Sequence, residues 1–215
     1  MRKIFQLILG VGVLGLCYVI FTQISTPIKF EDERVRKEKV VIEQLKDIRL
    51  AERRYKEVYG KYTDNFDTLI HFVLNDSLTM YKKLVDEDDS VGMAKFRQRQ
   101  KRDKKLRNRV EYKIAVIDTV FSPRKSVEDI KNLRYIPGTK TEFLLSTNTI
   151  TNENKSVDNY IECAAPYSWF LDTVKYRQEI INLVDDLKEN YDMYEGLKFG
   201  SMIESNNDAG NWKGE

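Results

Sequence analysis

Histidine and cysteine are scarce in this sequence of 215 residues, which contains one histidine, His71, and two cysteines, Cys17 and Cys163. Two cysteines exclude a disulfide-rich scaffold and a four-cysteine zinc site, and one histidine excludes a metal centre built from several imidazoles. Neither His71 nor Cys163 lies in the sequence context of a nucleophile and its base, so we expect packing or surface roles for both. A glycine-rich phosphate loop and a nucleophile elbow are also missing. We therefore predict a protein that is not an enzyme and that uses no cofactor or metal.

The chain also has little net charge, because 36 Lys and Arg residues oppose 34 Asp and Glu residues. A molecule with this balance has no overall field that attracts nucleic acid, so nucleic acid is not an expected partner. Hydrophobic residues make up 41% of the chain, which is too large a share for general disorder. We expect a folded core.

Charged residues are missing from one long stretch near the N-terminus, between Lys3 and Lys29. As a helix, residues 4–24 span about 30 Å, which is the thickness of the hydrocarbon core of a bilayer. We predict a transmembrane anchor at 4–24 behind a cytoplasmic head at 1–3. The alternatives are a cleaved signal peptide, a lipoprotein signal and a buried core helix. No Ala-x-Ala-like site follows, Cys17 lacks the small preceding residue of a lipoprotein signal, and a buried core helix is usually shorter and less uniformly apolar.

The orientation of this anchor rests on opposing signals. Arg2 and Lys3 favour a cytoplasmic N-terminus, whereas a larger group of cations follows the apolar stretch. Long domains cross the membrane largely regardless of charge, and a short basic head before an apolar run is typical of a signal anchor. We predict a single-pass protein of the bacterial cytoplasmic (inner) membrane, with its large domain outside the cytoplasm.

Residues 25–62 have the pattern of a linker followed by an amphipathic stem helix. We expect Pro27 to interrupt the helix, because proline has no amide hydrogen and its ring crowds the preceding turn. Apolar residues after Glu33 recur at steps of three and four, which places them on one face that must be buried. Gly60 suits the left-handed conformation that ends a helix. The residues expected to pack in this stem are Val41, Leu45, Ile48, Ala51, Tyr55, Gly60 and Tyr62.

The apolar N-terminal helix, its amphipathic continuation and the run Ala51-x-x-x-Tyr55-x-x-x-x-Gly60-x-Tyr62-Thr63 resemble the type II secretion pseudopilins and type IV pilins. The resemblance covers about the first third of the chain. In that family the helix packs on a small antiparallel sheet, and the run marks where the helix leaves the packing surface. The resemblance implies an α+β fold with additional helices, a structural or assembly role in a cell-envelope complex, and envelope proteins as partners.

The chain departs from this family in its N-terminal processing signals. Pilins are cut after a glycine and carry a glutamate five residues into the mature helix, whereas the first acidic residue after Lys3 is Glu31. Thr63 stands where the family has proline, and Pro27 lies in a segment that pilins keep helical. We therefore expect no cleavage by a prepilin peptidase. Any membrane-tethered domain with an amphipathic neck is also compatible with these residues.

Residues 63–204 carry the signals of an antiparallel α+β domain, because strand and helix patterns do not alternate as βαβ units. Short helices are expected after the capping residues Asp64-Asn65 and after Ser126, and a longer helix is expected at 175–190. A polar tail is expected at 205–215. The expected strands lie at 114–121, 142–151, 156–164 and 196–203, with residues 152–155 forming a hairpin loop between the second and third.

The strongest charge signal is the segment 95–113, in which ten of nineteen residues are Lys or Arg. The plainest interpretation is a solvated loop or edge segment, partly neutralised by the acidic loop at 85–91. The alternative is a cytoplasm-facing membrane adaptor that binds acidic lipid or nucleic acid. The acidic loop lacks the glycine and ligand spacing of a calcium loop. The candidate anion-binding residues are Arg97, Arg99, Lys101, Arg102, Lys104 and Lys105.

Overall fold

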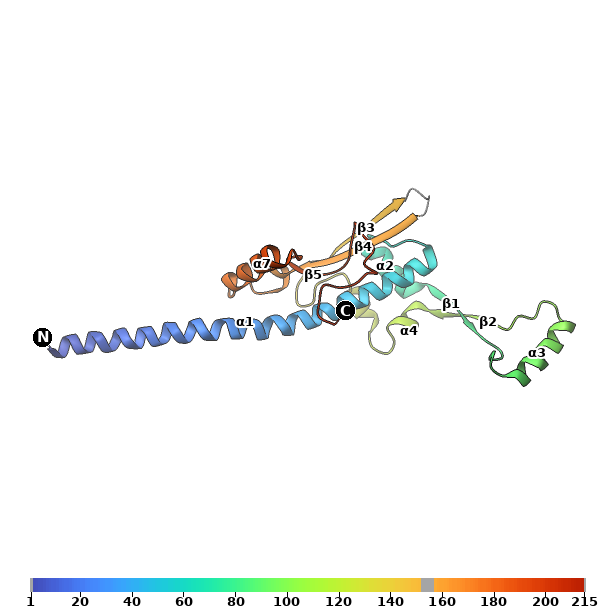
Figure 1. Ribbon diagram of the computed structural model, residues 1–215, viewed down its shortest axis with the longest axis horizontal. Helices are drawn as coiled ribbons and strands as arrows, with labels where there is room; N and C mark the ends of the chain where they lie inside the picture. Colours follow the sequence, from blue (N-terminus) through green and yellow to red (C-terminus); the bar gives the residue numbers. More distant parts are fainter. Residues whose placement is uncertain (1, 152–156, 215) are drawn as a thin grey trace. The chain divides into compact units, whose positions relative to one another are not determined.

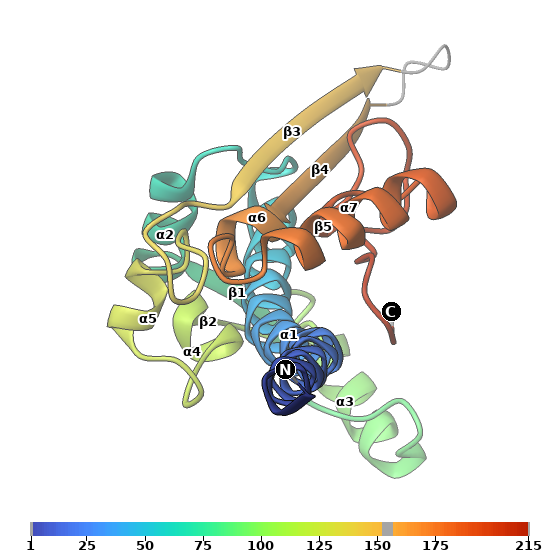
Figure 2. The same cartoon turned by 90° about the vertical axis from the view of Figure 1, so that its left-hand side faces the viewer.

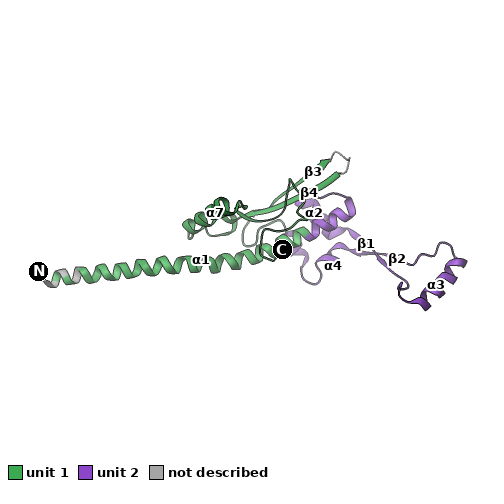
Figure 3. Ribbon diagram, viewed as in Figure 1, with its two compact units in different colours: residues 1–49, 134–215 green, residues 50–133 purple. Residues whose placement is uncertain are grey.

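The computed structural model describes residues 2–151 and 157–214, with all their side chains except those of residues 2, 3, 5, 7 and 8. The chain combines α-helices with antiparallel strands, which confirms the expected α+β class. It divides into two compact units (Figure 3). Unit 1 holds residues 1–49 and 134–215, and unit 2 holds residues 50–133. The segment expected as one globular domain at 63–204 is therefore shared between two units.

Helix α1 (Arg2–Tyr59) is one continuous helix of 58 residues, which is about 87 Å long at the α-helical rise. The expectation that Pro27 interrupts the helix is wrong, because Pro27 lies inside α1. A proline removes a single backbone hydrogen bond from the ladder, and the bonds on either side of it maintain the helix. The described side chains from Ile4 to Ile24 are exposed, apart from the half-buried Thr22.

A three-stranded antiparallel sheet with the order β3-β4-β5 lies in unit 1 (Figure 2). Strands β3 (Leu144–Thr151) and β4 (Val157–Pro166) form the expected hairpin, with Leu144 opposite Ala164 and Thr151 opposite Val157. The loop expected at 152–155 lies outside the described residues. Strand β5 (Gly196–Gly200) pairs with the other edge of β4, where Phe199 is opposite Cys163.

The core of unit 1 joins this sheet to α1 and to two further helices. Helix α6 (Tyr167–Phe170) follows β4 directly, and the expected longer helix is α7 (Arg177–Tyr191). Apolar side chains from β4, β5, α6 and α7 are buried together with the stem residues Val41, Leu45 and Ile48. The expected polar tail also packs in this unit, because Trp212 is buried and Gly210 forms a β-bridge with Phe199.

Polar contacts hold residues 30–49 of α1 against the rest of unit 1. The Lys37 ammonium donates to the Phe170 carbonyl at 2.8 Å, and the Gln44 amide donates to the Tyr135 carbonyl at 2.8 Å. The ring of Phe30 lies 5.4 Å from that of Tyr176, at the start of α7. These contacts order the part of α1 that directly follows the apolar stretch.

In unit 2 the end of α1 turns into helix α2 (Phe66–Asn75). Gly60 takes the left-handed conformation that we expected at the end of the stem. The buried Glu52 carboxylate accepts a hydrogen bond from the Thr63 amide at 3.1 Å, which fixes the turn between the two helices. The Tyr55 ring packs edge-on against Phe72 of α2 at 5.3 Å.

Two expectations about the caps in unit 2 are confirmed. The Asn65 side chain accepts from the amides of Asp67 and Thr68 and begins α2. Ser126 and Asp129 form the reciprocal capping box of helix α5 (Val127–Lys131). Both caps are local patterns that need no tertiary contact, which is why the sequence predicts them.

The strand expected at 114–121 is wrong over most of its length. Strand β2 (Val110–Ala115) ends near its start, and Val116–Val120 form helix α4. Val116 is fully buried, and its amide donates to the Asp76 carbonyl at 3.0 Å. Burial within unit 2 therefore outweighs the strand preference of the β-branched residues.

Strands β1 (Ser77–Lys82) and β2 form a two-stranded antiparallel ribbon, in which Met80 is opposite Tyr112. Helix α3 (Ser90–Arg102) lies beyond the end of this ribbon that points away from α2 and α4 (Figure 1). We call residues 83–109, which include α3 and the two segments joining it to the ribbon, the basic arm.

Candidate functional site

The first candidate surface is the apolar N-terminal part of α1. Among the described residues, α1 is the one helix that is long and apolar enough to cross a membrane, with an 18-residue window of mean hydropathy 1.7 that is 0% buried. Aliphatic and aromatic side chains such as Leu14, Tyr18 and Phe21 are 67% to 71% exposed. An exposed apolar surface of this size is typical of an interaction site, and its length matches the hydrocarbon core of a bilayer.

The second candidate surface is the basic arm. The expectation of a loop or edge segment is wrong for residues 95–102, which belong to α3. Asp89 caps the helix by accepting from the Gly92 amide at 2.9 Å. Lysine, arginine, glutamine and alanine dominate the helix and have high helix propensity, so α3 forms although it has no apolar periodicity.

The acidic loop neutralises the cations of α3 less than the sequence suggests. Glu87 pairs with Lys83 at 2.8 Å, outside α3, and the Asp89 carboxylate is engaged in capping. The hydrogen bond and the charge of the partner raise the pKa of Lys83 and lower that of Glu87. These acids leave the cations of α3 facing solvent. The exposed candidate residues are Arg97, Arg99, Lys101 and Arg102 on α3, with Lys104 and Lys105 in the following turn.

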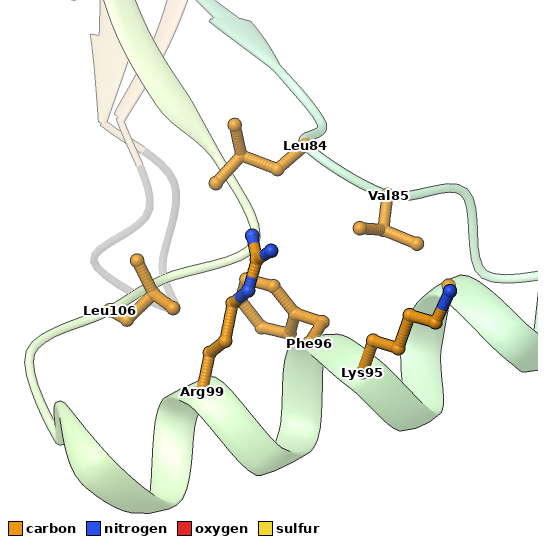
Figure 4. Close-up of a pocket in the computed structure, with 7 residues that line it drawn as sticks. Leu84, Val85, Lys95, Phe96, Arg99 and Leu106 are labelled. Atoms are coloured by element: carbon orange, nitrogen blue, oxygen red, sulfur yellow. The ribbon is translucent and has the colours of Figure 1, made fainter.

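A shallow groove with a volume of about 360 Å³ lies between α3 and the segments that join it to the ribbon (Figure 4). Its floor is formed by the buried Phe96 together with Leu84, Val85 and Leu106. Lys95 and Arg99 lie one turn apart on α3 and line the same groove. An apolar floor beside two cations suits a ligand that combines a negative charge with an apolar group.

Sequence reasoning found only part of this groove. It selected the cations of 97–105 by composition but missed Leu84, Val85 and Leu106, which come from segments on either side of α3. Local sequence does not reveal that these segments meet, because the pairing of β1 with β2 brings them together. The N-cap Asp89 followed by a run of helix formers is the signal that would have predicted α3.

The remaining sequence candidates lie elsewhere. The stem residues Val41, Leu45 and Ile48 are buried in unit 1, and Ala51, Tyr55 and Tyr62 are buried in unit 2. His71 is exposed on α2, and Cys163 is buried on β4. Across residues 2–151 and 157–214, no three His, Cys, Asp or Glu side chains gather as a group that could hold a metal ion.

Comparison with protein-family models, curated proteins and solved structures gives no match to this chain.

Proposed function

We propose that this chain is a non-enzymatic, single-pass membrane protein that carries a pilin-like α+β domain outside the cytoplasm. Its role is that of a structural or assembly component in a cell-envelope complex. The observation that supports this proposal most is the continuity of α1, which is apolar over residues 4–24, exposes nearly all of the described side chains there, and is buried along one face after Phe30. Because α1 is continuous, the proposed anchor and the buried stem residues of unit 1 belong to the same helix.

The resemblance to pilins supports the assembly role through the order of the elements. A long N-terminal helix comes first, its stem face is buried, and an antiparallel sheet follows in the same unit. The helix ends in the left-handed Gly60, at the position that the pilin-like run predicts. The missing site excludes cleavage by a prepilin peptidase, and in this proposal the head at 1–3 stays attached to the anchor.

Membrane topology tests this proposal. Alkaline phosphatase and a green fluorescent protein are each fused after Glu215 in an expressing bacterium. We expect high phosphatase activity and little fluorescence, because the phosphatase is active only outside the cytoplasm. Strong fluorescence with an inactive phosphatase would place the domain in the cytoplasm and overturn the proposal.

The anchor itself is tested by charge insertion. Each Arg near the centre of a spanning helix costs about 2.5 to 3.5 kcal/mol, so Val13→Arg with Leu14→Arg should move the chain from the membrane pellet to the soluble or aggregated fraction. Val40 is 47% exposed on the same helix outside the predicted anchor, and Val40→Arg serves as the control. Retention of the double variant in alkali-washed membranes would contradict the anchor.

The competing function is a cytoplasm-facing adaptor whose basic arm binds acidic lipid or nucleic acid. The exposed cations of α3 favour it, since closely spaced cations release counterions when they bind a polyanion. The two functions require opposite sides of the membrane. The same pair of reporter fusions therefore separates them.

A further inference from the structure

The nearly neutral chain carries two exposed helical faces of opposite charge. On α3, Lys95, Arg99 and Arg102 are spaced by four and three residues and lie on one face. On α7, the acidic residues Asp185 and Glu189 are four residues apart, as Lys95 and Arg99 are on α3. The two faces thus repeat their charges with the same period.

These charges are not used within the part of the chain that the structure describes. None of these five side chains has an ion-pair partner among the described residues, and all five are exposed. Lys188, the one cation in this part of α7, pairs with Glu195 at 2.5 Å. The acidic face of α7 is therefore not neutralised by its own helix.

Apolar groups accompany both charged faces. The groove beside Lys95 and Arg99 has Phe96 and Leu84 in its floor. On α7, Ile181 lies one turn before Asp185 on the same face and is 41% exposed. An aliphatic side chain from α7 fits a groove of about 360 Å³, which is at the small end of the range for ligand pockets.

We propose that the chain associates with a second copy of itself through the Lys95, Arg99 and Arg102 face of α3 in one copy and the Asp185 and Glu189 face of α7 in the other. Ile181 of the second copy covers the apolar floor of the groove. The matched spacing favours this partner over a lipid surface, which presents anionic headgroups without a fixed period. The two faces are different, so the contact is heterologous and allows a chain of copies or a closed ring.

The contact is weak between free molecules, because exposed ion pairs contribute little and salt screens them. Confinement of both copies to one membrane raises their effective concentration without any new contact. A second copy of the chain is thus a partner for the proposed assembly role. The contact rests on the proposed function only in that the membrane confines both copies. The association itself is a property of the full chain in detergent, where the side of the membrane has no influence.

Charge reversal in the full-length chain tests the contact. Sedimentation velocity in a nonionic detergent is measured over a range of concentrations and at low and high ionic strength. The first variant combines Lys95→Glu with Arg99→Glu, and the second combines Asp185→Lys with Glu189→Lys. We expect self-association of the unaltered chain that weakens with salt, and about tenfold weaker association for each variant alone.

An equimolar mixture of the two variants is the decisive sample. Each variant then meets a partner of opposite charge at both faces, so association should return to the level of the unaltered chain. Misfolded variants would not restore each other. A third variant, Arg97→Glu with Lys101→Glu, changes the net charge of the chain by the same amount on the opposite side of α3 and should associate normally.

Four results would overturn the proposal. These are an unaltered chain that stays monomeric at every concentration, a mixture that does not recover, and a third variant that loses association as strongly as the first. The fourth is a monomeric chain that binds phosphatidylglycerol vesicles through Lys95 and Arg99, which would assign the arm to lipid instead. None of these four results changes the activity of the phosphatase and fluorescent reporter fusions. A failure of the self-association proposal is therefore distinct from a failure of the proposed membrane role.

Discussion

The Tyr167 hydroxyl donates a 2.7 Å hydrogen bond to the Glu38 carboxylate and so joins α6 to α1 within unit 1. Tyr167 is buried, and Arg34 lies 3.8 Å from the same carboxylate. A hydrogen bond from a buried phenol to a charged carboxylate is strong, because no water molecule can take the place of the phenol as donor. This pair therefore fixes α1 to α6, which directly follows strand β4 of the sheet in unit 1.

Removal of this hydroxyl should weaken unit 1. Tyr167→Phe leaves the carboxylate without its phenolic donor and should lower the free energy of unfolding by about 1.5 to 3 kcal/mol. Chemical denaturation followed by circular dichroism measures the loss. Tyr191 is 64% exposed, so Tyr191→Phe is the matched control and should change stability by less than about 0.5 kcal/mol. Equal effects of the two changes would refute the role of the pair.

The same pair should respond to alkaline pH. Burial, and then the neighbouring Glu38, raises the pKa of Tyr167 above its ordinary value of 10.0. A group with a raised pKa in the folded state stabilises the fold below the unfolded value and loses that contribution as the pH rises above it. Below pH 10 the advantage of the unaltered chain over Tyr167→Phe should be constant. Above about pH 10 this advantage should shrink by about 1.4 kcal/mol per pH unit, because Tyr167 loses its proton in the unfolded chain and keeps it in the folded chain. The other tyrosines are present in both chains, so their contributions cancel in the comparison.

The buried face of the stem should be sensitive to truncation. Leu45 is 0% exposed in α1, and Leu45→Ala should cost about 2 to 5 kcal/mol through lost burial and the cavity left behind. Val40 lies on the same helix but is 47% exposed, and Val40→Ala should be nearly neutral. Thermal unfolding in detergent compares the two variants. A Leu45 variant as stable as the Val40 variant would show that the stem does not pack in solution.

The close approach of β5 to β4 should require a glycine at position 200. A Cβ atom there would lie 1.9 Å from the Ile161 carbonyl oxygen, and Gly200 has a φ of +78°. Gly200→Ala should destabilise unit 1 by about 3 kcal/mol or more, since the backbone of β5 has to move. Gly138 has a φ of +79° with nothing within 4 Å of its Cβ position, so Gly138→Ala isolates backbone strain and should cost about 1 kcal/mol.

The C-terminal segment should protect the outer edge of β5. The Asn211 side chain accepts from the Lys198 amide at 3.0 Å and donates to the Gly196 carbonyl at 2.8 Å. Asn211→Ala leaves these two groups of β5 without the side-chain bonds and should accelerate hydrogen exchange at the Lys198 amide. Asn182 lies on the exposed surface of α7, and Asn182→Ala should leave that exchange rate unchanged.

Features set by short-range patterns were predicted well. The caps at Asn65 and Ser126, the hairpin of β3 and β4, helix α7 and strand β5 all follow from residues close in sequence. Helix α3 was missed because its sequence has no apolar stripe at helical spacing, and the burial of its Phe96 depends on segments on either side of the helix. Helix α4 was missed because burial of Val116 overrides the local preference for a strand.

The two candidate surfaces also differ in how far the sequence predicts them. The apolar stretch at 4–24 was visible directly, because a spanning segment is defined by length and composition alone. The cations of 95–105 were also visible, but their arrangement beside a groove was not. That arrangement depends on Leu84 and Leu106, which lie 22 positions apart and meet only because β1 pairs with β2.

By itself the sequence determined the apolar segment, the helical stripe of the stem and the surplus of cations after residue 95, since each depends on the order of neighbouring residues. Only the tertiary structure decided that α1 continues through Pro27, that the chain forms two units, and that α3 and α7 expose charged faces with matching spacing. The physical reason is that burial and exposure are properties of the packed chain. Contacts between residues far apart in sequence, such as Glu38 with Tyr167, determine which faces are covered.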